Sequence, residues 1–344
     1  MSFFLPALPS CPAPTGHLVP LSRDIADYPD GIVLPIDKPY RWTSADVIRK
    51  VKFAAIKHFR KKNLKVGHAG TLDPLATGVL LVCIGPACKR AQEFQDHDKE
   101  YVAGIRFGAT TPSYDLEKEV DRTFPYDNVT EEAVRAVLPS FLGTQEQVAP
   151  LFSAKSVDGV RAYEMARKLY RNAQKGILDP DFDAAALETL HHSTITISEI
   201  ELLDFAEASA VTPRTKIFLP EKRSEKYCPT PCADATDSET VSSSVISSDL
   251  PSVLSSAAAG EVEKSVAGTA SSRINVADTS ALGLPEAHVR IACSKGTYIR
   301  AFARDLGEAL GTGAHLSSLV RTRTGDFSIG EALTLDQALA LLAE

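Results

Sequence analysis

The stretch VGHAGTLDPLATGVLLV, residues 66–82, places one carboxylate, Asp73, between small residues and an unbroken apolar run. The proline after Asp73 restricts it to extended backbone, because the proline ring clashes with a helical residue before it. The surrounding glycines allow a ligand or another segment to approach the backbone closely. The apolar run from Val79 to Ile84 is short and rich in branched side chains, which is typical of a buried strand. Asp73 is therefore either an ordinary turn residue or a single nucleophile in a tight loop.

The composition indicates a soluble globular protein with a real core: the chain has 344 residues, 44% hydrophobic and 24% charged. No apolar run approaches the length of a transmembrane helix. Residues 1–30 are apolar but broken by prolines and lack a basic start, so they predict a mobile N-terminal arm rather than a secretory signal. The six cysteines are scattered, which favours a reduced, cytoplasmic protein. Cys228 and Cys232 lack a second pair at ligand spacing, so no metal site is expected.

Positive charge is concentrated around the opening motif. The whole chain has a net charge of −7, yet residues 31–110 hold 14 Lys and Arg against 7 Asp and Glu. Such local excess is typical of a surface that binds a polyanion. A solvated basic helix would show the same pattern, and charge alone does not separate the two interpretations.

The hydrophobic patterns predict strands and helices without strict βαβ alternation, which favours an α+β domain with a mixed, mostly antiparallel central sheet flanked by helices and loops. Thr43 or Ser44 is expected to cap the first helix. The expected strands are residues 32–36, 79–84, 101–107, 193–204 and 288–293, and the later helices are residues 130–138, 162–173 and 299–310.

Residues 206–285 differ from the rest of the chain. They are rich in Ser and Ala and show no sustained hydrophobic period, so they bury too little apolar area to offset the entropy of ordering. We expect a low-complexity, disordered insertion within one catalytic domain that spans residues 31–335.

The stretch CSKGTYIRAFARDLG, residues 293–307, predicts a turn followed by a helix, with Tyr298 and Arg300 in its first turn. A helix N-terminus beside an arginine is a natural anion site, which could hold a phosphate or orient a carboxylate. The alternative, a core tyrosine and a surface arginine, fits these residues equally well in isolation.

Several segments, in order, resemble the TruB family of pseudouridine synthases, and the resemblance covers roughly residues 31–205 and 286–335. The segments are GIVLPIDKPYRWTSADVIRKVK, GHAGTLDPLATGVLLVCIG, DKEYVAGIRFGATT, SAKSVDGVRAYEMAR and CSKGTYIRAFARDLGEALGTGAHLSSLVRTRTG. The resemblance implies the pseudouridine synthase fold. It also implies isomerisation of the T-loop uridine of tRNA, at position 55, without cofactor or metal.

The family's site residues are carried over by motif. Asp73 corresponds to the nucleophile and Arg300 to its ion-pair partner, while Tyr101 corresponds to the tyrosine that stacks on the uracil and is a candidate for proton transfer. The resemblance also implies a substrate-binding set, in which His68 helps extrude the base, Leu319 packs near it and Lys38 supports the catalytic loop. That set is His68, Tyr298, Leu319, Lys38, Gly70 and Thr71.

The sequence also departs from the family pattern. TTPSYD, residues 110–115, keeps Thr111 and Asp115 of a longer Thr/Asp run, and FSAKS stands where YSALK is usual. We expect no complete C-terminal PUA domain. The expected partner is the tRNA T-arm, bound by a monomer with no membrane or metal. The alternatives are a tRNA-folding chaperone of the same fold and a guide-dependent synthase acting on rRNA.

Overall fold

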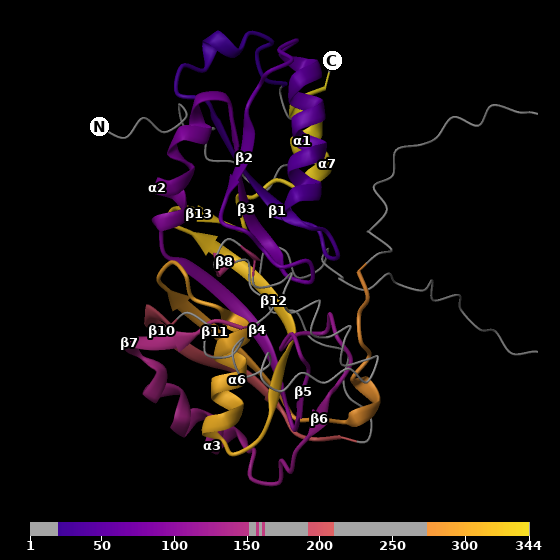
Figure 1. Ribbon diagram of the computed structural model, residues 1–344, viewed down its shortest axis with the longest axis vertical. Coiled ribbons are helices and arrows are strands. Elements are labelled where there is room, and N and C mark those ends of the chain that lie inside the picture. The colour runs from indigo at the N-terminus through magenta and orange to yellow at the C-terminus, as the bar shows by residue number, and fades with distance from the viewer. Residues whose placement is uncertain (1–19, 151–155, 158–159, 162–191, 210–273, 344) are drawn as a thin grey trace, which may run out of the picture.

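The computed structural model describes residues 20–150, 156–157, 160–161, 192–209 and 274–343 (Figure 1). Within them lies a nine-stranded sheet with the order β1-β3-β12-β4-β11-β10-β7, to which β2 adds beside β3 and β13 beside β12. The bounds are β1 Ile32–Lys38, β2 Val66–Ala69, β3 Thr77–Ile84, β4 Lys99–Phe107, β7 Gly143–Val148, β10 His192–Ala206, β11 Glu286–Cys293, β12 Ala314–Thr324 and β13 Phe327–Ser328.

All strand pairs of this sheet are antiparallel except β3 with β12, so the expected mixed, mostly antiparallel sheet is confirmed. The helices are α1 Ser44–His58, α2 Ala91–Asp96, α3 Glu131–Val137, α6 Ile299–Ala309 and α7 Leu335–Leu341. Short strands complete the description: β5 Ala109–Thr110, β6 Arg122–Thr123, β8 Ser156–Val157 and β9 Val160–Arg161. In the described part of the chain, 3-10 turns lie at Ile25–Asp27, Gly85–Arg90, Leu138–Phe141 and Ser280–Leu282.

The apolar run of the opening motif forms β3, and every residue of that strand is buried. Alternate side chains point to opposite faces of a strand. Leu80, Val82 and Ile84 therefore enter the main core, while Val79, Leu81 and Cys83 enter a smaller core that also contains Phe94 of α2. An unbroken apolar run is thus required because both faces of this strand are covered.

Helix α1 begins at the expected cap. Thr43 accepts a hydrogen bond from the Asp46 amide and Asp46 accepts one from the Thr43 amide, which together form a capping box. The buried stripe of α1, with Val47 and Val51, packs into the main core. Helices α1 and α7 lie side by side in the upper part of Figure 1, whereas α3 and α6 lie in the lower part.

Segments at both ends of the described chain pack onto the domain. Residues 20–30, the described part of the expected arm, are packed rather than extended: the Leu21 amide donates to the Leu341 carbonyl, and Ile25 and Tyr28 lie against the main core. Helix α7 extends the domain beyond residue 335, because its buried face joins the same core. In both segments, a few apolar side chains among polar ones make the contacts with the core.

The expected insertion begins and ends where the β10–β11 hairpin closes, since Ala206 pairs with Glu286. Its last part is packed: the Ala277 amide donates to the Leu116 carbonyl, and Arg106 donates to the Thr279 hydroxyl. Residues 210–273 of the insertion, with Cys228 and Cys232, lie outside the described residues, as does the helix expected at residues 162–173.

Candidate active site

The loop that carries Asp73 joins β2 to β3 and is held from three sides. On the first side, Ser44 at the start of α1 bonds to the backbone of Leu72. The Ser44 hydroxyl accepts from the Leu72 amide at 3.0 Å and donates to the Leu72 carbonyl at 3.1 Å. Within the loop, the Ala76 amide donates to the Asp73 carbonyl at 3.1 Å. Leu72 and Ala76 are buried, so the side chain of Asp73 is presented from a fixed turn.

Lys38, at the end of β1, holds the loop from a second side. Its side chain is fully buried, and its ammonium group donates to the carbonyls of Pro39, Trp42 and Pro74 at 3.0, 2.5 and 3.1 Å. Burial lowers the pKa of Lys38 to about 7, against the negative charges of Asp73 and Asp37, which raise it. Lys38 thus bonds to the loop from behind and lines neither of the two cavities described below.

Arg321, on β12, holds the loop from the third side. Its guanidinium is buried and donates to the carbonyls of Gly70, Thr71 and Val79 at 3.1, 3.5 and 2.7 Å. The chain comes so close here that a Cβ on Gly78 would lie 2.2 Å from the Arg321 carbonyl oxygen, and Gly78 has a φ of +97°. Gly78 therefore permits both the backbone conformation and the contact of β3 with β12.

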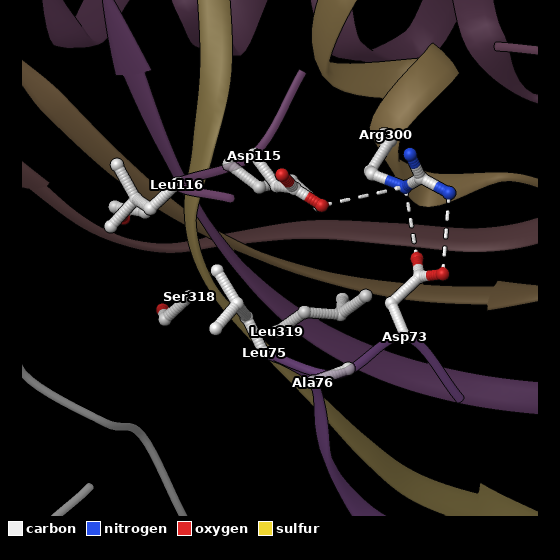
Figure 2. A pocket seen from close by; sticks show the side chains of 10 residues that line it. Asp73, Leu75, Ala76, Asp115, Leu116, Arg300, Ser318 and Leu319 are labelled. Carbon is white, nitrogen blue, oxygen red and sulfur yellow. Dashed lines mark hydrogen bonds and ion pairs between the residues drawn. The ribbon is translucent and has the colours of Figure 1, made fainter. Parts of the chain in front are cut away.

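Asp73 and Arg300 form a two-point ion pair (Figure 2). The Arg300 Nε lies 2.9 Å from Oδ2 of Asp73, and its Nη2 lies 3.2 Å from Oδ1. The Arg300 side chain is 5% exposed, whereas that of Asp73 is 37% exposed. A rigid guanidinium that binds both oxygens fixes the carboxylate's orientation while leaving part of it accessible.

A second carboxylate, Asp115, lies beside Arg300, with 3.7 Å between Oδ2 and Nε. The Ser113 hydroxyl and the Glu117 amide donate to its Oδ1 at 2.6 and 2.9 Å. Burial raises the pKa of Asp115 to about 6, although the charge of Arg300 opposes this. Arg300 is thus placed between two carboxylates, and only Asp73 is substantially exposed.

A cavity of about 630 Å³ opens on one side of Asp73. Gly70, Thr71, Tyr101, Tyr298 and Leu319 line it, together with both buried arginines. Its volume falls in the range of pockets that hold small organic ligands, so a single nucleotide can enter. The structure therefore brings together residues that are far apart in the sequence, from β4, α6, β12 and the loop.

Tyr101 forms a buried wall of this cavity. Burial raises the pKa of its phenol, against the neighbouring Arg321, so the phenol is neutral at neutral pH. On the other side of Asp73, Leu75, Leu116 and Leu319 line a smaller cavity of about 20 Å³ (Figure 2). Leu319 lines both spaces, as do Asp73 and Arg300.

Comparison with known proteins identifies the family. The model of the TruB family pseudouridylate synthase N-terminal domain matches residues 57–177, and that of the tRNA pseudouridylate synthase B C-terminal domain matches residues 300–344. A protein named tRNA pseudouridine synthase B from Phocaeicola vulgatus is 37% identical over 310 residues, covering 90% of this chain and 92% of its own. The chain belongs to the TruB family. A namesake from Bacteroides thetaiotaomicron is 39% identical over 89% of this chain and 91% of its own.

Solved structures similar to this TruB chain include the crystal structure of a Cbf5-Nop10-Gar1 complex, at 22% identity and a TM-score of 0.47. That match covers 94% of this chain and 58% of the other. Another is an H/ACA RNP bound to a substrate RNA containing 2′-deoxyuridine, with a TM-score of 0.43, of which this chain covers 51%.

His68, like Lys38, lies outside both cavities although the TruB motifs place it in the substrate-binding set. It lies on β2, one residue before the buried Ala69, and lines neither cavity. Its Nδ1 is buried without a hydrogen-bond partner, and burial, followed by the charge of Arg321, lowers its pKa. A neutral imidazole with an open nitrogen is able to hydrogen-bond a nucleotide, but the assignment of His68 to base extrusion stays a prediction.

Sequence reasoning did not assign site roles to Arg321, Asp115, Ser44 and Gln147. Gln147 fixes the start of α6, because its amide bonds to both backbone groups of Tyr298, at 2.8 and 3.1 Å. Asp115 was visible as a motif match and Arg321 lies in a matching segment, so position within a motif was the available signal. Ser44 also lies in a matching segment but was expected only as a possible helix cap, and Gln147 lies in none of the matching segments. Their partners are backbone groups that only the fold brings close.

The described residues contain no group of His, Cys, Asp and Glu side chains arranged to hold a metal ion. A search of the same residues for a helix of the length and hydropathy needed to cross a bilayer finds none.

Proposed function

We propose that this protein is a tRNA pseudouridine synthase that isomerises the T-loop uridine at position 55. The observation that carries the proposal is the Asp73 carboxylate, aligned by a buried arginine and facing a nucleotide-sized cavity. The proteins named tRNA pseudouridine synthase B, which share more than a third of its residues over nine-tenths of the chain, support this substrate.

The geometry suits cleavage of a glycosidic bond followed by formation of a carbon–carbon bond. Pseudouridine formation breaks the N1–C1′ bond, turns the uracil and joins C5 to C1′, while the C5 proton leaves and N1 gains a proton. A carboxylate can form a covalent intermediate or stabilise an electron-poor sugar. Because Arg300 binds Asp73 from the protein side, the carboxylate approaches the sugar in one orientation.

The detached uracil has to stay in the site, and water has to stay out. Tyr101 and Leu319 provide apolar surfaces in the cavity beside Asp73. Excluding water prevents hydrolysis to an abasic product. The neutral phenol of Tyr101 can pack on the uracil face, and the proton-transfer role expected for it is part of this proposal.

The target base is inaccessible inside a folded T-loop, so the protein acts on a nucleotide flipped out of its stack. The basic excess of residues 31–110 supplies phosphate attraction for the T-arm. We further propose that the protein works as a cytoplasmic monomer and needs neither cofactor nor metal, since the chemistry described uses only side chains.

The test is tritium release from [5-³H]uridine in an unmodified tRNA transcript. The wild-type protein is expected to release label without added guide RNA, and Asp73→Asn is expected to release none while binding the transcript as before. Mapping the modified position then identifies the uridine. Equal activity of Asp73→Asn would reject the mechanism.

The two alternatives give different results in the same assay. A folding chaperone without activity would bind the transcript and release no label in either protein. A guide-dependent enzyme would release label only when guide RNA and its partner proteins are added.

A further inference from the structure

The wall of the large cavity away from Asp73 is polar and is bridged by an ion pair. Helix α2 supplies Gln92, Gln95 and Asp96 to this wall, and the turn after β11 supplies Ser294 to Thr297. The Lys295 ammonium lies 3.0 Å from Oδ1 of Asp96 and joins the two elements. None of these residues is used by the reaction proposed above.

The turn that carries Lys295 is fixed at its base. Ser294 exchanges hydrogen bonds with Thr196 of β10, through its amide at 2.8 Å and its hydroxyl at 2.9 Å. The Thr297 hydroxyl donates to the Ser294 carbonyl at 2.9 Å. Gly296 has a φ of +82° and no atom within 4 Å of a Cβ placed on it, so the tip of the turn is open. Lys295 therefore projects from a rigid base into an accessible space.

The ion pair itself exchanges easily. The side chains of Lys295 and Asp96 are 60% and 44% exposed, and exposed pairs contribute little to stability. Asp96 also accepts a hydrogen bond from Gln92 at 2.9 Å. This bond keeps the Asp96 carboxylate in the same position after Lys295 has moved away. An RNA strand entering the cavity brings phosphates, which attract Lys295 and are repelled by Asp96.

We propose that Lys295 is a phosphate ligand for the RNA strand that enters the cavity, and that Asp96 holds it in the free protein. On binding, Lys295 exchanges the carboxylate for a phosphodiester of a nucleotide beside the target. The inference rests on the proposed function in that the ligand is RNA. It assigns opposite roles to the two partners, because one attracts the strand and the other competes with it.

The experiment measures binding of an unmodified tRNA transcript to full-length protein carrying Asp73→Asn, so that no turnover occurs. Lys295→Ala is expected to raise Kd about fivefold and to reduce the slope of log Kd against log salt by about 0.7 to 0.9, the value for one phosphate contact. Lys295→Arg is expected to keep the slope. Asp96→Asn is expected to lower Kd about two- to fivefold, and the double variant is expected to keep the reduced salt slope of Lys295→Ala.

A matched control is the Arg135–Glu131 pair of α3, whose side chains are 56% and 45% exposed and line neither cavity. Arg135→Ala and Glu131→Gln are expected to leave Kd and the salt slope unchanged. Weaker binding in both Lys295→Ala and Asp96→Asn would overturn the inference, because it would show a structural brace. An unchanged salt slope in Lys295→Ala would overturn it as well.

Failure of the proposed function would be seen separately. A wild-type protein that releases no tritium refutes the activity, whereas the salt slopes are read from binding alone. The two results are therefore independent.

Discussion

Arg300 and Arg321 are both buried beside the same loop, and they differ in what they face. Arg300 binds a partly exposed carboxylate at the cavity edge, whereas Arg321, which also lines the cavity, donates to three backbone carbonyls of the loop and β3. A guanidinium bound to a reactive carboxylate orients that carboxylate toward the substrate. A guanidinium bound to buried carbonyls supplies the hydrogen bonds that no backbone amide provides there. The comparison predicts that changes at Arg300 affect the reaction and changes at Arg321 affect stability.

The largest effect is expected for Arg300→Lys, which should lower the activity. A lysine keeps the charge but loses the two-point contact with Asp73, so the carboxylate is misaligned. We expect the single-turnover rate of tritium release to fall about 100- to 1,000-fold, in line with the loss of one oriented catalytic contact. A rate within threefold of wild type would show that alignment by Arg300 is unnecessary.

The next largest effect is expected for Gly78→Ala, which should lower the stability of the fold. The new Cβ would lie 2.2 Å from the Arg321 carbonyl oxygen, and the φ of +97° is strained for alanine. We expect a loss of about 3 kcal/mol or more in the free energy of unfolding, measured by urea denaturation.

Gly143→Ala is the control, because Gly143 has a φ of +91° but nothing within 4 Å of its Cβ. It isolates the backbone strain from the steric clash. Equal losses in the two variants would show that the contact between β3 and β12 tolerates a methyl group.

A smaller loss of stability is expected for Arg321→Lys. Lysine cannot reach all three carbonyls, and each buried acceptor left without a donor costs about 1–3 kcal/mol. We expect about 2 kcal/mol less stability in urea, with Arg323→Lys on the same strand, whose side chain is 41% exposed, near wild type. A loss of activity with unchanged stability would instead give Arg321 a direct role toward substrate.

The last prediction concerns the pH dependence of stability and Asp115. Its pKa is about 6 in the folded protein and lower in the unfolded chain, so the folded state binds the extra proton between about pH 4 and pH 6. The contribution of Asp115 to stability is therefore fully present below pH 4 and is lost as the pH rises through 6. The melting temperature of wild type relative to Asp115→Asn should fall over this range. A constant difference would place Asp115 outside the buried ion-pair cluster.

Much of the architecture was predictable from local patterns. The alternation in β4, β10 and β11, the apolar run of β3 and the Thr43 cap all follow from neighbouring residues, and these elements are confirmed. The packing of residues 20–30 and of α7 was not predicted. Each segment has only a few apolar residues, and these are buried only because the fold places α1 beside them. For the same reason, the bonds of Ser44 to Leu72 and of Gln147 to Tyr298 could not be predicted.

The sequence by itself determined that a lone acid lies in a small-residue loop before a strand covered on both faces, and its motifs identified Asp73, Tyr101 and Arg300 as belonging together. Only the tertiary structure decided how Asp73 is held. Its alignment depends on Lys38, Ser44 and Arg321, which bind backbone groups, and backbone groups are chemically the same at every position. A sequence specifies such contacts only through the fold that brings the partners together.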